Sequence, residues 1–181
     1  MRKDFKLKTP FPALPIVVIA TYDKKGVANA MTAAWATLYD FGYVFVSLAK
    51  EHKTAANLVA NKAFTLAFAT KETVKLADYF GMVSGNKVNK IKASGVKVTK
   101  SKFVNAPIID KFPVTIECKV KEYKDEILIG EIVNTSIDSK YVVKNKPSLD
   151  KIKFVLYDSF TNVYKETGSK LFKAFTTKKA K

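Results

Sequence analysis

The sequence offers few side chains that could carry out chemistry unaided, because it contains one histidine, His52, and one cysteine, Cys118. Zinc sites built on cysteine and histidine cannot be assembled from this pair, and neither can a nucleophile with a spare histidine base. In "FPVTIECKV", Cys118 alternates with Val114, Ile116 and Val120, which favours a place in the core over a reactive thiol. If the chain is an enzyme, we expect a bound cofactor to carry the reaction.

A run of small residues surrounds the only tryptophan, Trp35. Residues 29–38 read "NAMTAAWATL", which is neither an alternating strand nor a charged helix. Small side chains let a large flat ligand lie close to the backbone, and they equally suit a packed strip inside the protein. This stretch alone leaves both interpretations open. We expect Trp35 to anchor the strand by packing rather than to stack on a ligand.

A predicted strand runs into a predicted helix within residues 47–58, "SLAKEHKTAANL". The first turn of a helix presents unpaired backbone N–H groups and the positive end of the helix dipole. We predict Thr54 as the N-cap, with His52 and Lys53 just before it. A phosphate could be held there by main-chain donors, a hydroxyl and an ammonium group. An ordinary capped helix without a ligand is the alternative.

A third stretch, "GMVSGNKVNK", places Gly81 and Gly85 on either side of Ser84, with Lys87 and Lys90 following. Glycines permit close approach of the backbone to a ligand, and the hydroxyl and ammonium groups suit anions or carbonyl oxygens. The spacing is not that of a Walker A loop, and no GxGxxG fingerprint occurs in the sequence. A flexible surface loop is the alternative.

These stretches must be positioned by a chain that reads as many strands and few helices. The patterns predict strands at 16–22, 27–35, 42–49 and 63–70, with a turn at 23–26 between the first two. They predict helices at 53–62 and 71–82, the second burying Val74, Leu76, Ala77 and Phe80. Residues 83–102 read as a loop.

The second half predicts two long strands within 112–138, joined near Lys124 and Asp125, a last strand at 152–159 and a short terminal helix at 168–175. Hairpin-linked strands of this kind favour a mainly β fold with short helices, an antiparallel and Greek-key-like barrel, over a doubly wound sheet. We expect a single domain over residues 1–181, with an N-terminal arm at 1–14 and a disordered tail at 176–181.

Charge and hydropathy limit the classes of function. The formal charge is +16, yet Arg2 is the only arginine, and proteins that read bases rely on arginine forks. The alternative is a basic barrel that binds single-stranded nucleic acid and stacks bases on some of its 13 phenylalanines and 8 tyrosines. The shortage of arginine disfavours it. No apolar run approaches the roughly 20 residues of a membrane span, and the N-terminus lacks the pattern of a secretory signal. We expect a cytoplasmic protein with no membrane association.

Taken together in this order, the small-residue strand, the strand-to-helix turn, "AFTLAFAT", "VSGNKVNK" and the aromatic tail "YDSFTNVYKETGSKLFKAF" resemble the flavin reductase-like family. These are FMN-binding split β-barrels that include the flavoredoxins, and the resemblance runs from about residue 15 to about residue 175. It implies a homodimer with FMN near the subunit interface, for which the apolar strands around Phe64 and Phe68 would be suitable. It also implies NADH or NADPH as the electron donor.

The resemblance carries a set of site residues onto this sequence. The isoalloxazine ring would lie against Asn29, Met31, Thr32, Ala33 and Ala34, and Ser47, Leu48 and Ala49 would flank the ring and the ribityl chain. The phosphate would lie near His52, Lys53, Thr54 and Asn57, where many relatives have an arginine. The family's Ser-Gly pair, often contributed by the partner subunit, corresponds to Ser84 and Gly85. The family's lysine and its terminal Tyr and Gly correspond to Lys90, Tyr164 and Gly168.

Two activities follow from the resemblance, and in both the flavin carries the chemistry without a catalytic side chain or a metal. The first is an NAD(P)H-dependent FMN reductase, an oxidoreductase that passes hydride from the nicotinamide nucleotide to FMN. The second is an electron-transfer flavoprotein of the flavoredoxin type that is reduced by a redox protein partner. The sequence contains no stand-alone nicotinamide fingerprint that would separate them.

Overall fold

The computed structural model of the chain describes residues 1–176, so residues 177–181 of the predicted tail lie outside the described part. Its helices are α1 (Lys53–Asn61), α2 (Val74–Met82) and α3 (Lys90–Ser94), with two 3-10 turns at Ser139–Tyr141 and Leu149–Lys151. The strands are β1 (Leu14–Pro15), β2 (Val17–Tyr22), β3 (Ala28–Ala33), β4 (Ala36–Asp40), β5 (Tyr43–Ser47), β6 (Ala63–Phe68), β7 (Val98–Lys100), β8 (Pro107–Ile109), β9 (Val114–Lys124), β10 (Ile127–Ile137), β11 (Val142–Val143), β12 (Lys146–Pro147), β13 (Val155–Asp158) and β14 (Val163–Glu166). None of the helices in residues 1–176 is long and apolar enough to cross a membrane.

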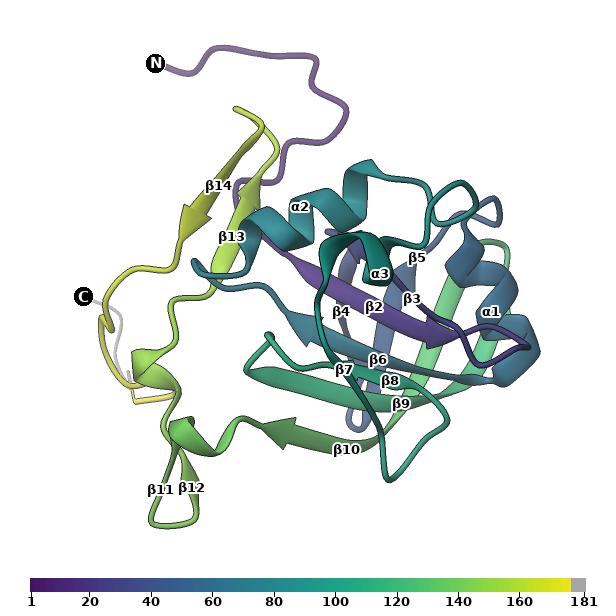
Figure 1. The fold of residues 1–181 in the computed structure, drawn as a ribbon. Helices are drawn as coiled ribbons and strands as arrows, with labels where there is room; N and C mark the ends of the chain where they lie inside the picture. Colours follow the sequence, from purple (N-terminus) through teal and green to yellow (C-terminus); the bar gives the residue numbers. More distant parts are fainter. Residues whose placement is uncertain (177–181) are drawn as a thin grey trace.

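Seven strands form one antiparallel sheet in the order β3-β2-β6-β9-β10-β5-β4 (Figure 1). Its two edge strands, β3 and β4, are joined by only two residues, Ala34 and Trp35. Three peptide links span at most about 11 Å, so the two edges must come close and the sheet must curl into a half-barrel. The predicted antiparallel split barrel is confirmed, and the small-residue stretch lies at its seam.

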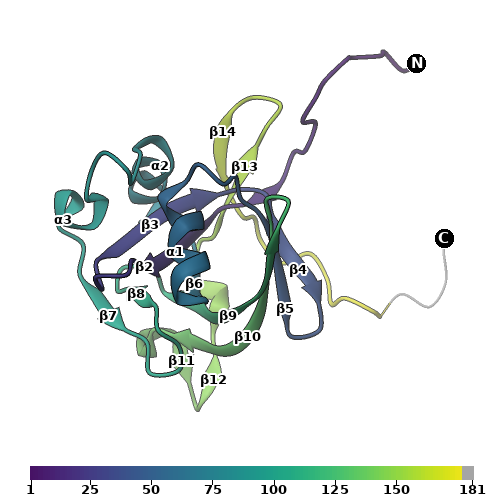
Figure 2. The ribbon, with the colours of Figure 1, turned by 90° about the vertical axis from the view of Figure 1, so that its right-hand side faces the viewer.

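Two apolar clusters on opposite faces of the sheet hold the curl together. Val17 and Ile19 of β2 point into the half-barrel, and Val18 and Ala20 point to the outer face beneath α2. This strand is buried on both faces, which explains why its sequence does not alternate. Helix α1 lies across one open end of the curl and adds Leu58 to the inner cluster (Figure 2).

Phe64 and Cys118 belong to the inner cluster, and both are fully buried. Burial raises the pKa of the Cys118 thiol to about 12, as expected for a core cysteine. Gly130 makes room for Phe64, because a Cβ at this position would lie 2.3 Å from the phenylalanine Cζ. The expectation that Phe64 could serve an interface is wrong, since the barrel core covers it.

The C-terminal part differs from the prediction. The strand expected to be last is β13, and it is followed by β14, which pairs with it in a small sheet that also includes β1. The terminal helix predicted at 168–175 is wrong, because this segment has no helical turns. Its apolar side chains, including Leu171 and Phe172, are exposed, and a short helix without a surface to pack against is not stable. Figure 1 shows the β13–β14 hairpin beside α2 and apart from the main sheet.

Two further predictions need correction. The stretch 83–102 is not only a loop, because it contains α3 and the whole of β7. Helix α3 begins where Asn89 accepts a hydrogen bond from the N–H of Lys92 and ends at Gly95, whose φ is +66°. The predicted strand 27–35 is also too long, because β3 ends at Ala33 before the seam.

Candidate functional site

Two adjoining pockets lie where β3, the start of α1 and the end of α2 meet. The first, the helix pocket, has a volume of about 350 Å³ and is lined by Asn29, Met31, Thr32, Glu51, His52, Lys53, Thr54, Phe80, Gly81, Met82, Val83, Ser84, Gly85 and Lys90. The second, the strand pocket, has a volume of about 380 Å³ and is lined by Met31, Thr32, Ala33, Ala34, Trp35, Ser47, Ala49, His52, Glu126 and Tyr157. The shared residues Met31, Thr32 and His52 connect them.

Strand β3 and helix α2 form one wall of the site and are held at a short distance from each other. The hydroxyl of Thr32 donates to the main-chain oxygen of Ala77 at 2.5 Å. One turn further along α2, a Cβ on Gly81 would lie 3.4 Å from the Cβ of Thr32. This is an ordinary van der Waals distance, so a Cβ at position 81 would still let the helix lie against the strand.

Asn29, Thr54 and Gly85 come together at the bottom of the helix pocket. The Nδ2 of Asn29 donates to the Oγ1 of Thr54 at 2.9 Å, and both side chains are buried. A Cβ on Gly85 would lie 2.3 Å from the Oδ1 of Asn29, so the loop after α2 must have glycine here. The three stretches that the sequence analysis singled out thus form one site.

The start of α1 opens onto the helix pocket. The helix begins at Lys53, its N-cap residue is His52, and among the described residues no side chain caps it. The prediction of Thr54 as N-cap is wrong, because Thr54 lies inside the first turn and its hydroxyl is engaged by Asn29. Uncapped N–H groups and the positive end of the helix dipole favour an anion at this end of the pocket.

Lys53 adds an ammonium group to this end of the pocket. Its Nζ lies 3.7 Å from Oδ2 of Asp23, and both side chains are about a quarter exposed. Hydrogen bonds from the N–H groups of Val27 and Lys25, followed by the charge of Lys53, lower the pKa of Asp23. The contact holds the ammonium group of Lys53 near Asp23, which itself does not line the pocket.

Lys90 is a second cation of the helix pocket, and it is buried. Only 3% of the residue is exposed, and its Nζ donates to the main-chain oxygen of Phe80 at 2.6 Å. Desolvation by burial lowers the pKa of Lys90 to about 8. An anion bound in this pocket would favour the charged form.

The strand pocket has a different character, because small side chains form much of its wall. Ala33, Ala34, Ser47 and Ala49 leave the backbone accessible. The expectation that Trp35 anchors the strand by packing is wrong, since 56% of this residue is exposed at the pocket edge. A flat ligand can therefore lie against the seam of the barrel.

The turn between β9 and β10 holds the far side of the strand pocket. Asp125 and Glu126 have φ angles of +48° and +63°, as in a tight two-residue hairpin turn, which confirms the predicted joint. The main-chain oxygen of Glu126 accepts from the N–H of Leu48 at 2.8 Å, and its Oε1 accepts from the N–H of Lys50 at 3.2 Å. The turn thus fixes Leu48 and Lys50, the two neighbours of Ala49, which lines the strand pocket.

Four of the predicted site residues line neither pocket, and one of them, Gly168, lines a separate pocket with Phe154 and Thr167. Leu48 is buried in the inner core cluster. Asn57 is buried one turn into α1, where its Nδ2 donates to the Oγ1 of Thr21 at 2.9 Å. Tyr164 donates from its hydroxyl to Asp78 on α2. All the other predicted site residues are on the pocket walls.

Several lining residues were not singled out as site residues by the sequence analysis. The lining residues at the end of α2 have the pattern of a buried helix face. Gly81 is the only one among them that indicates close approach of the backbone to a ligand. Tyr157 comes from β13 and Glu126 from the turn between β9 and β10, and no local pattern places either of them beside the strand pocket. The missed residues are Trp35, Glu51, Phe80, Gly81, Met82, Val83, Glu126 and Tyr157.

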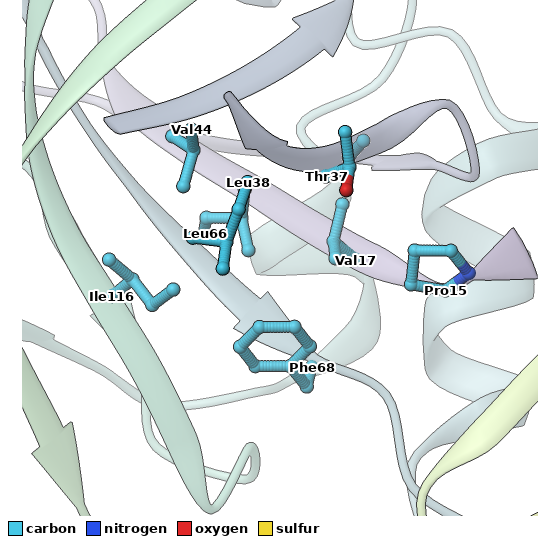
Figure 3. A pocket seen from close by; sticks show the side chains of 9 residues that line it. Pro15, Val17, Thr37, Leu38, Val44, Leu66, Phe68 and Ile116 are labelled. Atoms are coloured by element: carbon cyan, nitrogen blue, oxygen red, sulfur yellow. The ribbon is translucent and has the colours of Figure 1, made fainter. Parts of the chain in front are cut away.

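Another pocket, of about 280 Å³, lies inside the mouth of the half-barrel (Figure 3). Its side chains come from β1, β2, β4, β5, β6 and β9, and Thr37 is the only one with a polar group. Figure 3 shows Leu38, Leu66 and Phe68 around the opening. This pocket has no donor set for catalysis or for an anion.

Comparison with known proteins agrees with this geometry. The family model for the flavin reductase like domain matches residues 12–153. The structure is similar to flavoredoxin of Desulfovibrio vulgaris (Miyazaki F), with a TM-score of 0.93 and 29% identity over 99% of this chain and 100% of that one. It is also similar to flavoredoxin from Methanosarcina acetivorans, with a TM-score of 0.85 and 26% identity over 97% of each chain. An uncharacterized protein of Archaeoglobus fulgidus is 26% identical over 168 residues, which is 90% of this chain and 92% of that protein. The chain therefore belongs to the flavin reductase-like family, and its fold is that of the flavin-binding redox proteins.

Proposed function

We propose that the protein binds FMN across the helix pocket and the strand pocket and acts as an NAD(P)H-dependent flavin reductase. One observation carries this proposal: a pocket suited to an anion adjoins a pocket with a flat wall of small residues, and they meet at Met31, Thr32 and His52. FMN has the same two-part character, with a phosphate at one end and a large planar ring at the other.

The residues of the helix pocket fit a phosphate. Helix α1 starts without a side-chain cap among the described residues and has no acidic residue in its first turn. Lys53 and Lys90 add positive charge, and the hydroxyl of Ser84 lines the same pocket. Unpaired main-chain donors together with ammonium groups are the usual partners of a phosphate monoester.

The residues of the strand pocket fit the ring. Ala33 and Ala34 have small side chains that leave room for a ring at the seam of the barrel. Trp35 and Tyr157 border the opening. Bound FMN would supply hydride and electron transfer. The protein would hold the ring in place, exclude water from it and present main-chain N–H groups to its polar edge. No side chain of the chain has to act as an acid or base.

A second copy of the chain would complete the site, as the family resemblance implies. Strand β4 and its turn expose large apolar side chains, with Leu38 at 68% and Phe41 at 99% exposed. Contiguous apolar surface of this kind is typical of protein interfaces. The formal charge of +16 would in turn attract nicotinamide nucleotides, which are anionic, in a salt-dependent way.

Electron transfer without direct use of NAD(P)H is the second candidate. The observation that favours it is the similarity to two flavoredoxins over nearly the whole chain. In this case a redox protein would reduce the bound flavin, and the basic surface would favour an acidic partner.

The test is an absorption spectrum of the protein after loading with FMN and desalting, followed by anaerobic addition of NADH or NADPH. A retained flavin band supports the cofactor site, and its bleaching by either nucleotide supports the reductase. A band that persists with both nucleotides supports the electron carrier. A protein that retains no flavin and does not turn over added FMN contradicts both candidates.

A further inference from the structure

Tyr157 is the first residue of the aromatic tail 157–175, and it reaches the strand pocket from β13. It lies on β13, where its ring packs partly buried against the outer core cluster. Its hydroxyl donates to the Oδ1 of Asn162 at 2.6 Å, in the turn that follows the strand. The polar end of the side chain is thus occupied, and the ring borders the pocket together with Ala34 and Trp35.

Tyr164 lies beside this ring on the neighbouring strand, β14. It pairs directly with Tyr157 across the β13–β14 ladder, and the two ring centroids lie 5.9 Å apart at an interplanar angle of 52°. Tilted aromatic pairs at this separation attract each other and limit each other's rotation. Tyr164 itself lines neither pocket, so it can affect a ligand only through its neighbours, of which Tyr157 lines the strand pocket.

Asp78 connects the Tyr157–Tyr164 pair to α2, which with β3 forms the other wall of the site. The hydroxyl of Tyr164 donates to the Oδ1 of Asp78 at 2.7 Å, although 86 residues separate them. The preceding residue on α2, Ala77, accepts the hydrogen bond from Thr32, which lines both pockets. The contacts therefore run in a closed path from β3 through α2 and Tyr164 to Tyr157 and back to the pocket.

Few other contacts hold β14 in position. All four of its residues are exposed, and within the described residues it pairs only with β13. Lys71 and Glu166 form a salt bridge of 3.1 Å, but both side chains are well exposed and such pairs contribute little. Tyr164 is exposed as a residue, but partial desolvation of its hydroxyl, followed by the bond to Asp78, raises its pKa to about 12, so the hydroxyl keeps its proton over the physiological range.

We propose that Tyr157 is the aromatic wall against which the flavin ring lies, and that Asp78 and Tyr164 are positioning residues that set how closely it approaches. This inference rests on the proposed function, since it assigns a role within the same site. It concerns the ring and not the phosphate. Riboflavin, which has the ring and lacks the phosphate, therefore separates it from the role of the helix pocket.

The experiment compares the dissociation constants of FMN and riboflavin for the full chain, measured by quenching of flavin fluorescence. Tyr157→Ala should weaken both ligands by a similar factor, about tenfold, because the lost contact is with the ring. Tyr164→Phe and Asp78→Ala should each weaken the binding of both flavins by about threefold. Either change removes only the hydrogen bond between Tyr164 and Asp78, and the Tyr157 ring itself stays in place. Asp78→Asn keeps an oxygen acceptor and should bind both flavins within about twofold of the original protein.

The absorption spectrum of the bound flavin is the second measurement. It would stay unchanged if these residues only stabilised the fold. Tyr157→Ala should shift the flavin band relative to the original protein, and Tyr164→Phe should shift it in the same direction by less. Thermal unfolding of each variant identifies any loss of folding. Unchanged affinity for riboflavin and an unchanged band in folded Tyr157→Ala would overturn the inference while leaving the proposed function intact. Failure of the original protein to bind either flavin would overturn both.

Discussion

Lys90 and Phe80 are joined by a buried hydrogen bond of 2.6 Å that places an ammonium group in the wall of the helix pocket. In residues 1–176 no carboxylate forms a salt bridge with Lys90. The main-chain oxygen of Phe80 offers a dipole but no opposite charge, so burial lowers the pKa of the lysine to about 8. The charge that could neutralise it is that of an anionic ligand.

The affinity for FMN should therefore fall as the pH rises through 8. A bound phosphate holds Lys90 in its protonated form, whereas the free protein loses this proton, so we expect about a tenfold loss between pH 7.5 and 9.5. Riboflavin should bind with little change over this range, and Lys90→Met should remove the dependence for FMN. Fluorescence titrations of both ligands at several pH values test this. If Lys90→Met keeps the slope, protonation of Lys90 does not govern the binding of FMN, and this explanation is refuted.

Lys53 should matter for the phosphate and not for the ring. Replacing it with alanine should weaken FMN by about tenfold, a typical cost of losing a charge-assisted contact, and should leave riboflavin unaffected. Lys24→Ala is the matched control, because Lys24 is exposed on the turn that also carries Asp23. Isothermal titration of both variants with FMN gives the comparison. Equal losses in the two variants would mean that the overall positive charge, and not this position, attracts FMN.

Features with a local cause were predictable from the sequence. The turn at 23–26 formed as predicted because Asp23 accepts hydrogen bonds from the N–H groups of Lys25 and Val27, and Gly26 adopts a φ of +77°. The hairpin at Asp125 follows from the same kind of turn chemistry. The three stretches that meet at the candidate site were likewise visible, because each combines its residue types within about ten positions.

Features that depend on distant contacts were not predictable. Tyr157 joins the strand pocket only because the β13–β14 hairpin lies beside α2, and no pattern around Tyr157 encodes that neighbour. Thr54 looked like a helix cap because its hydroxyl could serve the backbone, yet Asn29, 25 residues earlier, engages it. The apolar residues at 168–175 have helical spacing, but a pattern cannot reveal whether a partner surface exists for them.

Gly85 should tolerate no side chain. A Cβ there would lie 2.3 Å from the Oδ1 of Asn29, so Gly85→Ala must displace either the loop or the amide that binds Thr54. We expect Gly85→Ala to lower the affinity for FMN by at least about tenfold and to destabilise the fold by about 1–3 kcal/mol. Gly81→Ala is the control, because its Cβ would meet Thr32 at 3.4 Å and alanine favours a helix. Calorimetry and FMN titration test both variants, and similar losses in the two would refute the steric explanation.

Glu117 should stabilise the fold without affecting the site. It is 1% exposed on β9, where its carboxylate accepts hydrogen bonds from the hydroxyl of Ser101 and, at 2.7 Å, from the Nδ2 of Asn134. Glu117→Ala leaves both donors without their acceptor and opens a cavity, so we expect the free energy of unfolding to fall by about 2–4 kcal/mol. Glu122→Ala, an exposed change on the same strand, should cost less than about 0.5 kcal/mol. Urea unfolding measures both. Because Glu117 lines neither pocket, the folded variant should bind FMN within about twofold of the original protein, and a larger loss would mean that the outer face of β9 communicates with the site.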